Sequence, residues 1–234
     1  MYGMFGYASK FNGELATNEA LGYWGTGSVK DFGTMFAKSP FNQDISGWDT
    51  SSAEDMSYMF YGVSSFNQDV SKWDVSKVTT FRSTFKDCQN LDTDLSQWDV
   101  SSVMSFQQTF TKAYLMNSDM SLWNTAEVLN MYGMFQYART FNSPIENWDV
   151  SKVTDMGYMF YGALAFQQDV SGWNVAGVPL NTQTSNGVMY YSYFINIFYD
   201  ATQMSAYWKC DNTLGLETES IKHCPPNLLV PRSL

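Results

Sequence analysis

Aspartates recur at a fixed spacing along most of this 234-residue chain. One column, the first aspartate column, consists of Asp44, Asp69, Asp94, Asp119 and Asp169. If the repeating units stack as strands of a sheet, neighbouring carboxylates lie roughly 5 Å apart and repel by about 0.8 kcal/mol in water. A row of Ca²⁺ ions would offset this repulsion, because Ca²⁺ takes oxygen ligands. Alternatively, each carboxylate accepts a backbone N–H at a turn, which is the interpretation we favour.

Neutral oxygens run beside these carboxylates. They belong to Asn42, Asn67, Asn117 and Asn142, and to Ser46, Ser71, Ser96, Ser121 and Ser171. The candidate binding residues on this polar face are Asn42, Asp44, Asn67, Asp69, Asp94, Asn117, Asp119 and Asp169. A second aspartate column, Asp49, Asp74, Asp99 and Asp149, directly follows tryptophan and is typical of turns. Calcium is therefore an alternative cofactor here, and the primary expectation is no cofactor.

Six tyrosines form a candidate contact patch. They are Tyr58, Tyr61, Tyr132, Tyr137, Tyr158 and Tyr161, and they flank an apolar stripe. Tyrosine is favoured at contact surfaces because it carries a large area at low entropic cost. The alternative, which the sequence leaves equally open, is that these rings pack between neighbouring units with their hydroxyls in water.

Residue types suited to catalysis are scarce. The single histidine, His223, adjoins Cys224, and a Cys–His pair would need an orienting third group. A Cys210–Cys224 disulfide closing a C-terminal cap is the expected role of that cysteine, with two free thiols as the alternative. The chain contains no phosphate-binding loop, nucleophile elbow or HExxH motif. We therefore expect a protein that is not an enzyme.

Charge and hydropathy limit the classes of partner. The net charge is −10, with 23 acidic against 13 basic residues, and an acidic surface repels phosphate backbones. The sequence therefore predicts no nucleic-acid partner. It also lacks an apolar window of about 18 residues that could span a bilayer. The chain begins inside a repeat, so the missing signal peptide says little about its compartment.

Tryptophan marks the repeat that must position all these residues. It occurs at Trp48, Trp73, Trp98, Trp123, Trp148 and Trp173, each 25 residues after the last. Two apolar columns share the period, beginning at Phe36 and Phe41. We expect a tandem array over residues 1–176, with an insertion at about 14–21, and a divergent last unit with a cap over 177–234. Because the tryptophans keep step with the apolar columns, they are expected in the core rather than on an exposed sugar-binding platform.

The periodicity changes within each unit. Met156, Met159, Phe160 and Ala163 have the spacing of a helical stripe. Residues 66–71 alternate between apolar and polar types and predict a short strand with one polar face. One short parallel β-strand and one short helix per 25-residue unit predict an α/β repeat solenoid similar to a leucine-rich-repeat protein.

The repeated motif itself resembles a known family. The string Met-Phe-x-x-Ala/Gly-x-x-Phe-Asn-Gln-Asp-Val/Ile-Ser-x-Trp-Asp-Val-Ser resembles the BspA-like leucine-rich-repeat surface proteins, most clearly over 59–79 and 148–173. The resemblance covers residues 1–176 and weakens at Pro144 and at 124–126. It implies a secreted or cell-surface module for adhesion and protein–protein interaction, without catalytic activity. The implied partner is a protein or glycan on a cell surface or matrix, and carbohydrate-binding or calcium-dependent adhesion is the alternative.

Overall fold

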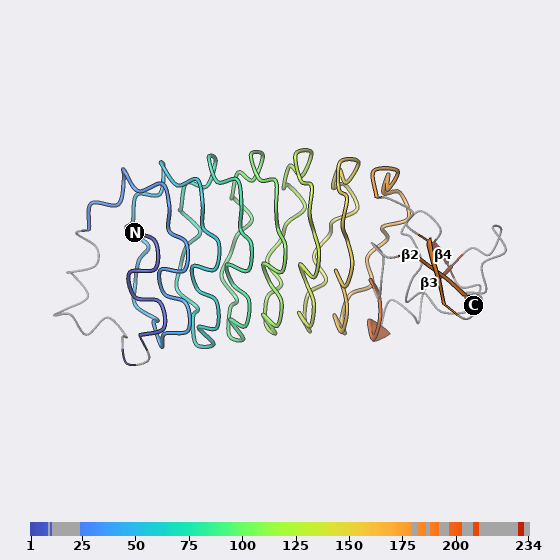
Figure 1. Ribbon diagram of the computed structural model, residues 1–234, viewed down its shortest axis with the longest axis horizontal. Helices are drawn as coiled ribbons and strands as arrows, with labels where there is room; N and C mark the ends of the chain where they lie inside the picture. The colour runs from blue at the N-terminus through green and yellow to red at the C-terminus, as the bar shows by residue number, and fades with distance from the viewer. Residues whose placement is uncertain are drawn as a thin grey trace.

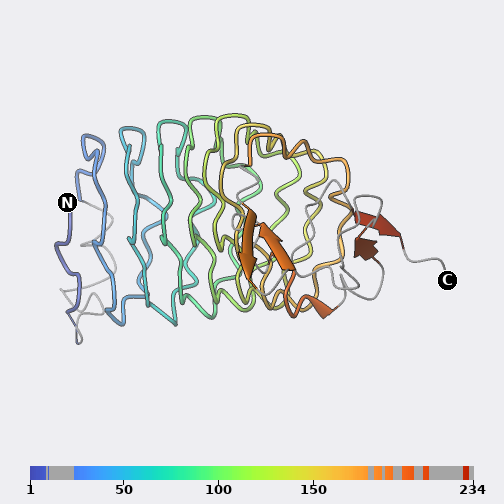
Figure 2. The same cartoon turned by 45° about the vertical axis from the view of Figure 1, so that its right-hand side comes forward.

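The chain forms a row of stacked coils, each about one 25-residue repeat long. The computed structural model describes residues 1–8, 10, 24–178, 182–185, 188–191, 197–202, 208–210 and 229–231. The coils follow one another along the longest axis of the molecule, starting from the N-terminus (Figure 1). Turned by 45°, the same view shows successive coils lying side by side with their upper and lower turns aligned (Figure 2).

Among the described residues, regular strands occur only beyond the regular coils. Strand β1 spans Thr182–Ser185 and pairs antiparallel with β2, Val188–Tyr191. Strand β3 spans Trp208–Cys210 and pairs antiparallel with β4, Leu229–Pro231. Strands β1 and β2 fall within residues 177–234, where the sequence predicts a divergent last unit with a cap.

The expected α/β solenoid with a helix and a strand in each unit is wrong. Within residues 24–178 the structure contains neither a helix nor a strand of two or more residues. The repeating units do stack, as the period indicated, but turns and short extended stretches build each coil. The local structure therefore differs from that of a leucine-rich repeat.

A run of linked turns replaces the expected helix. We call this run the ladder segment: residues 32–39 in one coil and 56–63 in the next. Every second amide donates to the following coil, as from Phe36 N to Met59 O at 2.9 Å, and the intervening amides bond three residues back, as from Met35 N to Phe32 O at 3.2 Å. Positive φ angles interrupt the segment, at Thr34 (53°) for example. A helix cannot continue through such residues.

The stripe that predicted a helix is nevertheless buried. Met156, Met159, Phe160 and Ala163 are all inaccessible to solvent. Consecutive turns bring residues three and four apart to the same side, as a helix does. The predicted core was therefore correct at these positions, and the predicted backbone conformation was not.

The predicted strand at residues 66–71 fails for a different reason. Phe66 and Val70 point into the core, but the amide of Asn67 donates to the side-chain Oδ1 of Asn42 at 3.1 Å. Side-chain oxygens of the neighbouring coil thus replace the backbone carbonyls that a sheet would use. Parallel backbone pairing is reduced to single-residue bridges along one column, Asp31–Asp55–Thr80–Ser105–Asn130–Asp155.

Tryptophan lies in the core, as expected. Trp48 and Trp73 are each 4% exposed, and their rings stack with centroids 6.4 Å apart. The indole N–H of Trp98 donates to Val70 O of the preceding coil at 3.0 Å. Equivalent bonds join Trp73, Trp123, Trp148 and Trp173 to the coil before each. The ring fills the core and its nitrogen ties two coils together, so an exposed sugar-binding platform is excluded.

The array ends with a displaced coil. Phe198 stacks on Phe160 with centroids 5.6 Å apart, and Phe160 N donates to Ile197 O at 2.8 Å. Phe198 therefore continues the phenylalanine column that begins at Phe36. The insertion at 14–21 and the cysteine Cys224 of the expected disulfide lie outside the described residues, as does most of 177–234. Cys210 ends β3.

Candidate binding face

The two aspartate columns shape turns. In the first column each carboxylate accepts the amide of the serine two residues ahead, for example Ser46 N to Asp44 Oδ1 at 2.9 Å. Asp69, Asp94, Asp119 and Asp169 repeat this bond. The second column does the same at Asp49, Asp74, Asp99 and Asp149. Each carboxylate thus has the turn role that the sequence favoured.

These bonds also set the acidity of the aspartates. Hydrogen bonds from the hydroxyl and amide of Ser71 hold the pKa of the Asp69 carboxyl below its usual range. The amide and hydroxyl of Ser46 likewise lower the pKa of Asp44, against a smaller opposing effect of Asp69. Among the described residues, no three His, Cys, Asp or Glu side chains come together in a metal-binding group.

The predicted asparagines form a ladder of their own. Asn42 Oδ1 accepts the amide of Asn67 at 3.1 Å, and Asn67 Oδ1 accepts that of Asp92 at 2.8 Å. Asn117 and Asn142 repeat this role. Gln68 Nε2 adds bonds to both oxygens of Asn42 at 3.0 Å. The structure therefore brings the eight residues of the polar face into aligned columns, where their side chains hydrogen-bond within the array.

Sequence reasoning missed a third polar column. It consists of Asp31, Asp55, Thr80, Ser105, Asn130 and Asp155, the residues that form the single-residue bridges. Each accepts the amide two residues ahead, as in Gly157 N to Asp155 Oδ1 at 3.0 Å. Burial raises the pKa of Asp155, against the lowering effect of that amide. In the sequence, each member of this column is a polar residue five places before a phenylalanine of the column that includes Phe60.

A tyrosine cluster occupies the outer side of the last ladder segments. It consists of Tyr132, Tyr137, Tyr158, Tyr161 and Tyr199, all of which are partly exposed. Ring centroids lie 5.6 Å apart for Tyr132–Tyr158 and for Tyr158–Tyr161, 5.1 Å for Tyr137–Tyr161, and 4.9 Å for Tyr161–Tyr199. The structure thus brings four of the six predicted tyrosines together and adds Tyr199.

Two glycines let these rings lie against the backbone. A Cβ at Gly162 would come within 2.5 Å of Tyr137 Cδ1, and one at Gly157 within 3.2 Å of Tyr132 Cδ2. Gly162 also has a φ of +68°. The absence of a side chain at these two glycines leaves room for the rings beside the backbone.

The other two predicted tyrosines belong to a second group, the lysine–tyrosine strip. The strip consists of Tyr7, Lys38, Tyr58, Tyr61, Arg82 and Lys86. Lys38 Nζ lies 5.3 Å from the ring centroids of both Tyr7 and Tyr61. Arg82 Cζ lies 5.6 Å from the Tyr58 ring, and Lys86 Nζ lies 5.9 Å from the Tyr61 ring. The sequence reasoning missed these cations because Lys38, Arg82 and Lys86 stand in three different columns, and the residue type changes from coil to coil in each column.

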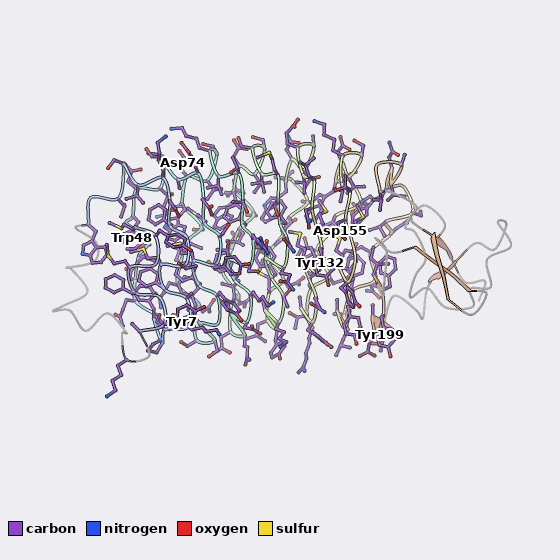
Figure 3. The ribbon with its side chains drawn as sticks, in the orientation of Figure 1. Tyr7, Trp48, Asp74, Tyr132, Asp155 and Tyr199 are labelled. Atoms are coloured by element: carbon purple, nitrogen blue, oxygen red, sulfur yellow. The ribbon has the colours of Figure 1, made fainter. Side chains whose placement is uncertain are left out.

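The two faces of the coil differ in chemistry. In Figure 3 Asp74, of the second aspartate column, lies along the upper edge of the array, and Tyr7 and Tyr199 lie along the lower edge. Tyr132 and Asp155 lie between these edges. The ladder segments therefore carry the aromatic side chains along the length of the array, and the turn aspartates gather elsewhere on each coil.

Comparison with known proteins places the chain in a family. A family model described as "Mycoplasma protein of unknown function, DUF285" matches residues 1–98 and again residues 79–196. The chain belongs to this family. Two overlapping matches to one DUF285 model are the expected result for a tandem array. No curated protein and no solved structure matched.

The description of the DUF285 family states no activity, so membership of the family assigns none to this chain. Within the parts of the chain that the structure describes, no helix is long and apolar enough to cross a membrane.

Proposed function

We propose that this array is a non-enzymatic binding module of a secreted or cell-surface protein, and that it attaches to a protein partner through the tyrosine cluster. The observation that carries the proposal is the continuous contact among five partly exposed tyrosines over three coils. Tyrosine is enriched among the residues that dominate binding energy at protein interfaces. The resemblance of the repeat to BspA-like surface proteins supports the adhesive role and the extracellular location.

The polar columns and the tryptophans are less suitable for binding a partner. The aspartates and asparagines already hydrogen-bond within the array, and the tryptophans are buried. The tyrosines of the cluster remain partly exposed while they contact one another, and Gly157 and Gly162 leave room for two of the rings. A partly exposed aromatic side chain that already packs against its neighbours can bury further area at little entropic cost.

The test is adhesion to immobilised collagen, laminin and fibronectin and to whole animal cells, measured for the wild type and for Tyr137→Ser/Tyr161→Ser. We expect one of these surfaces to bind the wild type, and the variant to bind at least about tenfold more weakly, since truncating an interface anchor costs about 2 kcal/mol or more. Tyr114→Ser is the matched control, because Tyr114 lies outside the cluster with Arg139 4.4 Å from its centroid. Equal adhesion by wild type and the double variant would refute the proposal.

A further inference from the structure

Three cations on the ladder segments have no carboxylate partner among the residues that the structure describes, although acids outnumber bases in this chain. The ion pairs among the described residues are Lys30–Glu54, Lys112–Asp87 and Lys152–Glu127. Lys38, Arg82 and Lys86 take part in none of them. These three are the cations of the lysine–tyrosine strip. The ladder segments of this acidic protein therefore carry three cations outside those ion pairs.

The strip is ordered along the array axis. Tyr7, Lys38, Tyr61 and Lys86 come from four successive coils and alternate aromatic with cationic groups. Lys86 Nζ also donates to Gln108 Oε1 at 3.1 Å, which fixes its direction. The strip thus presents a row of held positive charges rather than a set of freely moving lysines.

The surrounding acids do not cancel this row. The second aspartate column, to which Asp74 belongs, lies on the edge of the coil opposite Tyr7 (Figure 3). Charges further apart than about 8 Å are largely screened at physiological salt. Asp87, next to Lys86 in sequence, pairs with Lys112 at 3.6 Å. Burial lowers the pKa of Lys86, and the charge of Asp87 acts against this larger effect to raise it. An anion approaching the strip therefore meets Lys38, Arg82 and Lys86 together with the partly offsetting charge of Asp87.

We propose that the lysine–tyrosine strip binds an acidic polypeptide segment of the partner, a stretch rich in aspartate and glutamate that runs along the array. This inference rests on the proposed function and adds the chemical class of the partner. Carboxylates complement ammonium and guanidinium groups through charge-assisted hydrogen bonds. The contacts described for the tyrosine cluster are between rings, so the two groups contribute different contacts to one extended interface.

The ring geometry favours a polypeptide over an acidic sugar. A sugar stacks on an open aromatic face. Lys38 from the preceding coil and Lys86 from the following coil both lie within 6 Å of the Tyr61 centroid, and Arg82 lies over Tyr58. These cations occupy the ring faces. What remains accessible is the row of positive charges, which suits extended carboxylate side chains.

The experiment measures binding of fluorescent poly-L-glutamate to the full chain. The variant Lys38→Gln/Arg82→Gln/Lys86→Gln removes three positive charges from the strip. The matched control, Lys30→Gln/Lys77→Gln/Lys152→Gln, removes three from elsewhere on the coils, so both variants have the same net charge. We expect the strip variant to lose about tenfold in affinity and the control less than about twofold, because each exposed ion pair contributes about 1.4- to 5-fold in affinity and the strip variant loses three at one site. Melting temperatures confirm that both variants fold.

Several outcomes overturn the inference. They are no poly-L-glutamate binding by the wild type, equal weakening in both variants, or affinity that does not change between about 50 and 300 mM NaCl. Dextran sulfate binding that poly-L-glutamate cannot displace would identify an acidic glycan instead. Self-association in sedimentation that the strip variant abolishes would identify a second copy of this chain.

If the strip fails these tests while adhesion still depends on Tyr137 and Tyr161, the proposed function stands without it. If poly-L-glutamate binds through the strip and adhesion is absent, the strip binds acidic polypeptides and the proposed adhesive function fails.

Discussion

Trp98 gives the sharpest test of how the coils are held together. Its ring is 4% exposed and packs on Phe81 with centroids 5.1 Å apart, and its N–H donates to Val70 O. Trp98→Ala removes both ring and hydrogen bond, and we expect a loss of about 3–5 kcal/mol in the free energy of unfolding. Trp98→Phe retains an aromatic ring and removes only the hydrogen bond and the second ring.

The smaller substitution separates the two contributions. Val70 O also accepts the amide of Trp73 at 3.2 Å, so the carbonyl keeps one bond when the indole is lost. The hydrogen bond therefore contributes about 0.5–1.5 kcal/mol, and no buried group is left unsatisfied. With some lost burial, we expect Trp98→Phe to cost about 1–3 kcal/mol, clearly less than Trp98→Ala.

Urea denaturation followed by near-ultraviolet circular dichroism measures both costs, since the coils contain no helix to follow in the far ultraviolet. Leu122→Ala is the control: Leu122 is 80% exposed, and we expect a change within about 0.5 kcal/mol. Equal costs for Trp98→Phe and Trp98→Ala would show that the hydrogen bond, and not ring packing, dominates. A cost below about 1 kcal/mol for Trp98→Ala would refute a core role.

Two further substitutions test the backbone and the third polar column. Gly162→Ala should lower the free energy of unfolding by about 1–2 kcal/mol or more, because φ is +68° and the new Cβ would meet Tyr137. Gly172→Ala is the control. Gly172 has open space around it, so its substitution should be nearly neutral in the same urea titration. Asp155→Asn should stabilise the array at pH 7. Burial raises the pKa of Asp155 in the folded state, so its contribution to stability is greatest below the unfolded pKa of about 4 and declines as pH rises through the folded pKa. The asparagine removes this decline and keeps the oxygen that accepts the Gly157 amide, so a variant no more stable than wild type at pH 7 would contradict the argument.

The core was predictable because its residue types repeat. Trp98 and Phe85 belong to columns whose members are tryptophan or phenylalanine in coil after coil, and a buried ring tolerates few replacements. The period alone therefore located the core correctly and showed that units stack.

The local backbone was not predictable from the same pattern. Spacings of three and four residues arise in a helix and equally in a run of turns. Positive φ angles distinguish the two, and here they fall on residues such as Tyr58 and Gln108 as well as on glycine. Because those side chains do not favour that conformation, their types gave no warning. The strand prediction failed because Asn42 supplies a side-chain oxygen where a sheet would use a backbone carbonyl.

The candidate site was only partly visible for a related reason. The core columns and the three polar columns fix each coil, so the outward positions of the ladder segments are left free to vary. One such position, just after the phenylalanine, carries Tyr61, Lys86 and Tyr161 in different coils. A column that changes residue type gives no periodic signal, yet stacking aligns its members into one surface. Variation within an otherwise regular array thus marks the positions where this fold can acquire specificity, and it gives the first and last coils different chemistry: cations beside tyrosines in one, and tyrosines in contact with each other in the other.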